Sequence, residues 1–144
     1  MKNQSDTIIY LAHYRYKIQF ILGILSTIIF GRSLFQELAS DTALFTLISL
    51  GIALWSARDI WRYVEFTTRS VIFHRGFGTS PNEVDLRQMS SISEEGRMGR
   101  SITLLYHPKQ PDGLLDLDTV NSLIFPQLRD QEELYSKLEA AIPV

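Results

Sequence analysis

The sequence predicts an α+β membrane protein, in which an N-terminal hairpin of two transmembrane helices is followed by an antiparallel β-sheet or barrel that a C-terminal helix caps. Two uncharged apolar runs, Ile18–Gly31 and Thr42–Ala57, lie near the N-terminus. After Arg62 the apolar residues recur with a period of two, which is typical of strands, and the segment before Pro143 returns to a helical period. We therefore divide the chain into a hairpin over residues 1–60 and a cytosolic domain over residues 61–144.

The two apolar runs hold 14 and 16 residues between charges, whereas a typical span needs roughly 20. Lys17 and Arg32 lengthen the first run, because long basic side chains can reach the membrane interfaces from inside it. The second run extends through Trp55 toward Trp61. The predicted spans cover about residues 16–36 and 42–60. A buried hairpin in a soluble protein and a hairpin that enters only one leaflet stay open as alternatives.

Aromatic and basic side chains stand at the ends of both runs, where anchors to the membrane interface are usually found. They are Tyr14, Tyr16, Lys17, Arg32, Trp55, Arg58, Trp61 and Arg62. The loop between the spans holds Arg32 together with Glu37 and Asp41, so the excess of basic residues lies at the outer ends of the hairpin. By the positive-inside rule we expect both termini in the cytosol. Residues 3–12 are expected to begin a helix that lies in the interface.

The domain after the spans is expected to contain six short strands joined by turns rich in Gly, Pro and Ser. The predicted strands are Tyr63–Thr67, Ser70–Arg75, Glu83–Leu86, Met89–Ser93, Ser101–His107 and Leu114–Asp118. In the C-terminal helix, Asp130 and Glu133 have the spacing of a capping box. Leu134 and Leu138 share its apolar face, and Glu133 with Lys137 forms an i, i+4 ion pair.

Composition excludes several kinds of site. The chain has no cysteine, which removes disulfides, thiolate catalysis and thiolate metal sites. The domain after the spans is acidic, so it lacks the basic face that nucleic acid requires. The three histidines stand in different elements, and Asp116 and Asp118 share one face of an expected edge strand, which is a poor start for a cation site. We predict no catalytic residues, no metal, no cofactor and no enzymatic activity.

Two segments of the domain carry a resemblance. Tyr63–Gly76 reads as a hairpin with a threonine after its first strand and a glycine after its second, and Val84–Ile92 follows with apolar residues at spaced positions. With two spans ahead of them, these segments resemble the bacterial pleckstrin-homology-like (PH-like) membrane proteins over about Tyr14–Ile142. The resemblance implies a PH-like domain on a bacterial inner membrane and a role in scaffolding or complex assembly.

A narrower likeness concerns two turns. Arg75–Gly78 and the Glu95–Arg97 turn, with the strand that follows it, are similar to turns of the two-span photosystem I assembly factors of cyanobacteria and chloroplasts. This likeness would place the chain in a thylakoid membrane and give it an assembly role.

The residues that we expect to contact a partner stand in two loops, 76–82 and 94–100. They are Arg75, Phe77, Arg97 and Arg100. Phe77 is an apolar tip between two glycines, whereas Arg97 and Arg100 are offset by the adjacent Glu94 and Glu95. The sequence thus predicts a membrane-anchored interaction module whose partner is an integral membrane protein complex. The alternative is a PH-like domain that binds lipid or a small ligand at the membrane surface.

Overall fold

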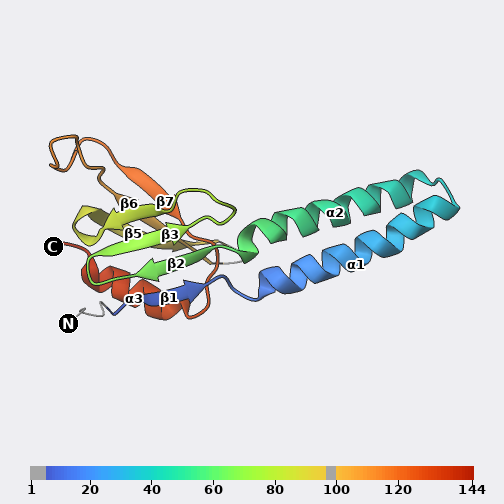
Figure 1. Cartoon of the computed structure of the whole chain (residues 1–144), viewed down its shortest axis with the longest axis horizontal. Coiled ribbons are helices and arrows are strands. Elements are labelled where there is room, and N and C mark those ends of the chain that lie inside the picture. The colour runs from blue at the N-terminus through green and yellow to red at the C-terminus, as the bar shows by residue number, and fades with distance from the viewer. Residues whose placement is uncertain (1–5, 97–99) are drawn as a thin grey trace. The chain divides into compact units, whose positions relative to one another are not determined.

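The computed structural model describes residues 6–96 and 100–144 (Figure 1). The chain divides into two compact units. One unit is the hairpin, His13–Trp61; the other, which we call the sheet unit, combines the segment that ends at Ala12 with Arg62–Val144.

The hairpin consists of α1 (Arg15–Gln36) and α2 (Ser40–Ile60). Their 22 and 21 residues correspond to a length of about 30 Å each at 1.5 Å per residue, the thickness of the hydrocarbon core of a bilayer. Both helices are long and apolar enough to cross a membrane. They exceed the uncharged runs because each helix continues through charged residues at its ends, such as Lys17 and Arg32 in α1 and Arg58 in α2.

Small residues let the two helices approach closely. Gly23 is buried against Ala53, and a Cβ atom added to Gly23 would stand 2.9 Å from the Ala53 backbone nitrogen. Ser49 and Ser56 are also buried on the same side of α2. Further along the seam, the rings of Phe30 and Phe45 stack with centroids 5.4 Å apart.

The first sheet of the sheet unit has four antiparallel strands in the order β1 (Ile8–Leu11), β2 (Tyr63–Phe66), β3 (Ser70–His74) and β4 (Asn82–Asp85). The expectation of an interfacial helix in residues 3–12 is wrong for Ile8–Leu11, because these residues pair with β2 as an edge strand. The sheet unit thus takes its first strand from the segment that the division at residue 60 had assigned to the hairpin. β2, β3 and β4 lie where the sequence predicted strands.

The second sheet has three antiparallel strands in the order β5 (Met89–Glu95), β6 (Ser101–Tyr106) and β7 (Asn121–Ile124). The prediction that Leu114–Asp118 closes this sheet is wrong. That segment forms turns, in which Asp112 accepts from the Leu114 amide and Asp116 from the Asp118 amide. These local hydrogen bonds compete with a strand ladder, and β7 takes the place beside β6.

The C-terminal helix is α3 (Gln131–Ala141), as predicted. The expected capping box is absent: Asp130 has a left-handed backbone (φ 52°) and its side chain makes no capping hydrogen bond. The Glu133 carboxylate instead accepts from the Tyr10 hydroxyl at 3.1 Å and pairs with Lys137 at 2.7 Å. The i, i+4 pair is therefore confirmed, and Glu133 also connects α3 to β1.

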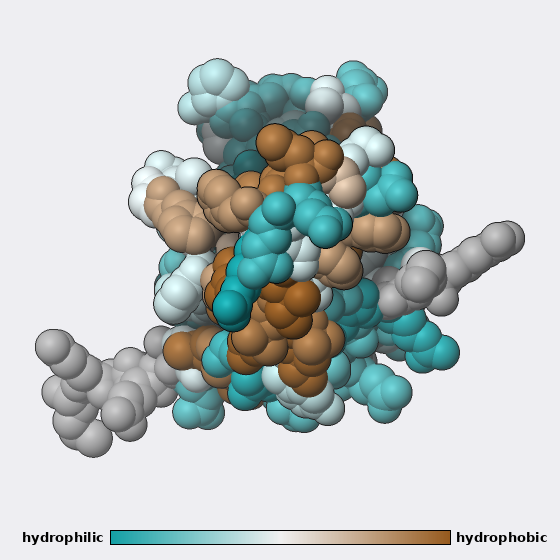
Figure 2. All heavy atoms as spheres, turned by 90° about the vertical axis from the view of Figure 1, so that its right-hand side faces the viewer, coloured by the Kyte–Doolittle hydropathy of each residue, from teal (hydrophilic) through white to brown (hydrophobic). Residues whose placement is uncertain are grey.

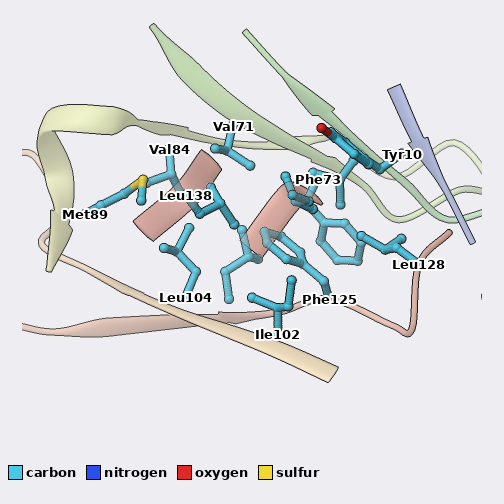
Figure 3. Close-up of a cluster of buried hydrophobic side chains, with 13 residues drawn as sticks. Tyr10, Val71, Phe73, Val84, Met89, Ile102, Leu104, Phe125, Leu128 and Leu138 are labelled. Carbon is cyan, nitrogen blue, oxygen red and sulfur yellow. The ribbon is translucent and has the colours of Figure 1, made fainter. Parts of the chain in front are cut away.

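Side chains from both sheets and from α3 form one hydrophobic core (Figure 3). Val64 and Val71 come from the first sheet, Ile102 from the second and Leu134 from the helix, and none of them is exposed. Phe125, just after β7, meets the ring of Phe73 edge-on with centroids 5.3 Å apart. The core explains why the helix is required: it covers apolar faces of both sheets at once.

Candidate functional site

The register of the first sheet gathers several chain segments at one end of the sheet unit. Leu11 pairs with Tyr63, and Tyr63 pairs with His74. The chain leaves the sheet unit after Ala12 and returns to it at Arg62, so this is the end at which the hairpin is attached. We call it the connection end and define it by Leu11, Ala12, Arg62, Tyr63 and His74.

The turn after β3 projects from the connection end and presents an aromatic side chain. Gly76, Phe77 and Gly78 have φ values of 77°, 50° and 72°, all in the left-handed region. The Thr79 amide and hydroxyl both donate to the Gly76 carbonyl, at 3.3 and 2.7 Å. Phe77 is 73% exposed. A bulky residue rarely adopts a positive φ, so the fold holds an exposed ring in a strained position where a smaller residue would fit better.

The loop after β5 is tied to the same end of the sheet unit. The Gln131 side-chain amide donates to the Glu94 carboxylate at 2.8 Å and to the Arg100 carbonyl at 2.9 Å. The same side chain accepts from the Leu128 amide at 3.2 Å, and Leu128 faces Ala12 in an isolated antiparallel bridge. The first residue of α3 therefore links this loop to the connection end.

The two loops chosen from the sequence thus belong to one end of the sheet unit. Arg75, Phe77 and Arg100 are exposed there. Arg97 lies outside the described residues. The sequence could not show that the loops share an end, because their proximity depends on the pairing of β1 and on the position of Gln131.

The residues predicted to anchor the chain at the membrane interface lie mostly at the two ends of the hairpin. Six of them stand where α1 begins and α2 ends: Tyr14, Tyr16, Lys17, Trp55, Arg58 and Trp61. Arg32 stands toward the opposite end, near the connection between the helices. Arg62 belongs to the sheet unit, and its guanidinium lies 6.0 Å from the centroid of the Phe73 ring.

Apolar side chains surround the hairpin. Seen from the end where the helices connect, apolar side chains lie on both sides of a strip of polar ones (Figure 2). Only 6% of the most apolar 18-residue stretch of α1 is buried, and 22% of the corresponding stretch of α2. Exposed apolar surface of this extent on two adjacent helices is not typical of a soluble protein.

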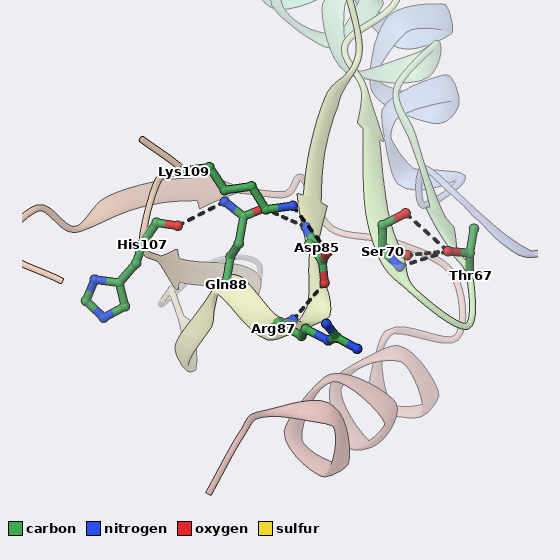
Figure 4. A network of polar contacts seen from close by, with 7 residues as sticks. All are labelled: Thr67, Ser70, Asp85, Arg87, Gln88, His107 and Lys109. Atoms are coloured by element: carbon green, nitrogen blue, oxygen red, sulfur yellow. Dashed lines mark hydrogen bonds and ion pairs between the residues drawn. The ribbon is translucent and has the colours of Figure 1, made fainter. Parts of the chain in front are cut away.

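A polar network at the opposite end of the sheet unit is structural (Figure 4). Asp85 accepts from the Arg87 amide, and Gln88 accepts from the Asp85 amide, so a capping box starts the short 3-10 helix Leu86–Gln88. Gln88 also donates to the His107 carbonyl, which connects the two sheets. The D-x-x-Q spacing is the sequence signal that could have revealed this box.

Asp85 also pairs with Lys109 at 3.3 Å. The hydrogen bond from the Arg87 amide, assisted by Lys109, lowers the pKa of Asp85 below its ordinary value. Two shallow surface grooves lie beside this carboxylate and are lined by residues of both signs, Arg69 and Glu83 among them. Asp85 accepts from the Arg87 amide and pairs with Lys109, so the charges around these grooves serve to stabilise the turn.

The second polar cluster connects β1 to α3. Burial raises the pKa of Tyr10, while the hydrogen bond from Lys137 lowers the pKa of Glu133 and, in return, raises the pKa of Lys137. Lys137 also lies 5.9 Å from the centroid of the Tyr10 ring. The cluster ties the edge strand β1 to α3 and so stabilises the sheet unit.

The described part of the chain holds no group of three or more His, Asp or Glu side chains arranged for a metal ion. His74 and His107 lie at or just after the ends of β3 and β6, and His74 stacks on Tyr63 with centroids 4.1 Å apart.

Comparison with known proteins finds no matching family model, no matching curated protein and no matching solved structure.

Proposed function

We propose that this protein is a non-enzymatic, membrane-anchored interaction module that serves as an accessory subunit or assembly factor of a membrane protein complex. In this proposal α1 and α2 span the bilayer, and the sheet unit is a cytosolic PH-like domain. The observation that carries the proposal is the exposed apolar surface around both helices of the hairpin.

Exposure argues against the alternative of a buried core hairpin. Leu47, Leu54 and Ile29 are 66%, 65% and 63% exposed, and they point away from the helix seam. Water would make such a surface costly at about 25 cal/mol for each Å² of apolar area, whereas lipid solvates it. The length of the helices favours a hairpin that crosses the whole bilayer rather than one confined to a single leaflet, since about 30 Å matches the full hydrocarbon thickness.

The connection end supports a partner within the membrane. Ala12 is three residues from the start of α1, and Tyr63 is three residues from the end of α2. Three residues reach at most about 11 Å, so a hairpin in the bilayer keeps this end of the sheet unit close to the membrane surface. Phe77 and Arg100 belong to this end, so the proposal assigns them to the contact with a neighbouring membrane protein.

The pairing of β1 with β2 supports a common side for both flanks of the hairpin. Because these strands are hydrogen-bonded neighbours, a chain whose hairpin lies in a bilayer would enter and leave it on one face. The basic residues Arg15, Lys17 and Arg58 at that end favour the cytosolic face.

The finer PH-like assignment is supported by the positions of the resembling segments. Tyr63–Gly76 covers the hairpin of β2 and β3, and Val84–Ile92 covers the end of β4, the 3-10 helix and the start of β5. Both segments are thus continuous pieces of the sheets that surround the core.

The test is a pull-down of the full chain in mild detergent, with mass spectrometry of the recovered proteins. We expect a stoichiometric membrane complex from the unchanged chain and at least a fivefold lower recovery with Phe77→Ser. Leu117→Ser is the matched control, because Leu117 is 70% exposed in a turn away from the connection end. Equal recovery with both variants would remove the Phe77 turn from the interface. Recovery of the chain with lipid alone would favour the lipid-binding alternative.

A further inference from the structure

An open groove of about 730 Å³ lies between α1 and α2, near the end at which α1 begins and α2 ends. Its lining changes along the helix axis. Arg15 and Arg58 line the outer part, and Ile48 and Ile52 line the part nearer the middle of the hairpin. Gly51 lies between the isoleucines, and a Cβ atom there would have no neighbour within 4 Å, so the groove is open at that point.

The two guanidinium groups are held at the mouth of the groove by neighbouring rings. Arg58 lies 4.4 Å from the Trp55 ring centroid, and its Nε is 3.5 Å from the Asp59 carboxylate. Arg15 lies 5.5 Å from the Tyr16 ring centroid. A guanidinium carries five N–H donors, so a ring contact and one carboxylate contact are compatible with donation to a phosphate.

The order of chemistry along the groove is that of a phospholipid: charge at the membrane interface, then aromatic edges, then aliphatic side chains toward the bilayer centre. The charge also matches. The lining contains two arginines and one aspartate, which leaves a formal charge of +1 against the single negative charge of a phosphodiester. Basic pockets between helices at the cytosolic side are suited to anionic headgroups.

We propose that this groove binds one anionic phospholipid, with its phosphate between Arg15 and Arg58 and one acyl chain along Ile48, Gly51 and Ile52. This inference rests on the proposed function, because it requires the hairpin to lie in a bilayer. The lipid would fill the space between the helices at the end where α1 begins and α2 ends.

The test uses the full chain in mild detergent, titrated with phosphatidylglycerol or phosphatidylcholine and examined by native mass spectrometry. We expect preferential retention of phosphatidylglycerol. Arg58→Gln should weaken it about tenfold or more, as expected for loss of a charge-assisted hydrogen bond. Arg32→Gln, at the other end of the hairpin, is the matched control and should bind as the unchanged chain does. Gly51→Leu, which fills the groove without changing charge, should weaken retention of both lipids.

Several results would overturn the proposal: equal retention by Arg58→Gln and Arg32→Gln, no effect of Gly51→Leu, or displacement of the lipid by millimolar inorganic phosphate. Circular dichroism of each variant, together with Arg58→Lys, which keeps the charge and should keep most of the binding, separates loss of the site from loss of the fold. Alkaline carbonate extraction of membranes comes first. Release of the unchanged chain would reject the membrane anchor and this site together, whereas retention with no lipid preference would reject the site alone.

Discussion

Phe77 combines a left-handed backbone with an exposed aromatic ring, two features that rarely serve stability. We expect Phe77→Asn to raise the free energy of unfolding by about 0.5–1 kcal/mol, because asparagine tolerates a positive φ and little apolar burial is lost. The same change should reduce recovery of the partner complex. Denaturation of the chain in detergent measures the first effect.

Phe77→Val is the opposite control, since a β-branched side chain is less compatible with φ near 50°. If Phe77→Asn and Phe77→Val change the free energy of unfolding in the same direction, backbone strain at Phe77 does not destabilise the fold.

Asp85 has two separable roles, as a cap and as a charge. Asp85→Ala should destabilise the sheet unit by about 1 kcal/mol through loss of the cap, while Asp85→Asn should keep the cap and lose only the ion pair with Lys109. Because the pKa of Asp85 is lower in the folded state, its charge stabilises the fold above its ordinary value of 3.8 and ceases to do so as the pH falls through the depressed value.

Thermal unfolding of the three chains between pH 7 and pH 2.5 checks both statements. The unchanged chain should lose more stability below pH 4 than Asp85→Asn does. Parallel acid profiles would show that other carboxylates dominate.

At the scale of single elements, the close seam of the hairpin gives a sharp contrast between two glycines. Gly23→Leu should destabilise the hairpin by about 1–3 kcal/mol or more, because even a Cβ atom at Gly23 meets the Ala53 backbone. Gly51→Ala should be neutral or raise stability by up to about 1 kcal/mol, because it gains helix propensity in open space. Thermal unfolding followed by helical circular dichroism in detergent measures both; equal effects would contradict the seam.

Some elements could be predicted from the sequence and others could not, for physical reasons. β2 and β3 are joined by a turn that Thr67 and Ser70 close with their own hydrogen bonds, so their signal is local. β1 has four residues, and its partner lies beyond the whole hairpin, so no local pattern identifies it. β7 follows a long turn region in which Leu114–Asp118 alternates as a strand would, yet the aspartates satisfy neighbouring amides instead.

Part of the candidate site could likewise be predicted from the sequence, and part could not. An exposed aromatic between two glycines was visible in the sequence as Phe77. The groove between the helices was not, because it requires the helix seam that brings Arg15 beside Arg58, and the shared end of the two loops depends on long-range pairing.

For the whole molecule, the absence of cysteine from the sequence makes the topology directly testable. Leu38 is 96% exposed between the helices, and Leu114 is 67% exposed in the sheet unit. With the hairpin spanning the bilayer, Leu38→Cys should react with an impermeant maleimide only from the side opposite to Leu114→Cys. Labelling of both from one side of sealed vesicles would support a hairpin that enters a single leaflet.

The pairing of Ile8 with Phe66 has a consequence in time. The two partners are 58 positions apart (66 − 8), and the hairpin lies between them. At about 5–20 residues per second, β1 waits about 3–12 s after synthesis before β2 exists. If the hairpin enters a membrane during synthesis, as proposed, its insertion therefore begins before the sheet can close, and β1 is an unpaired edge throughout that interval. Closure of the first sheet requires both flanks of the hairpin to lie in the same compartment, so a chain in which only one of the two helices crosses a bilayer would keep β1 and β2 apart.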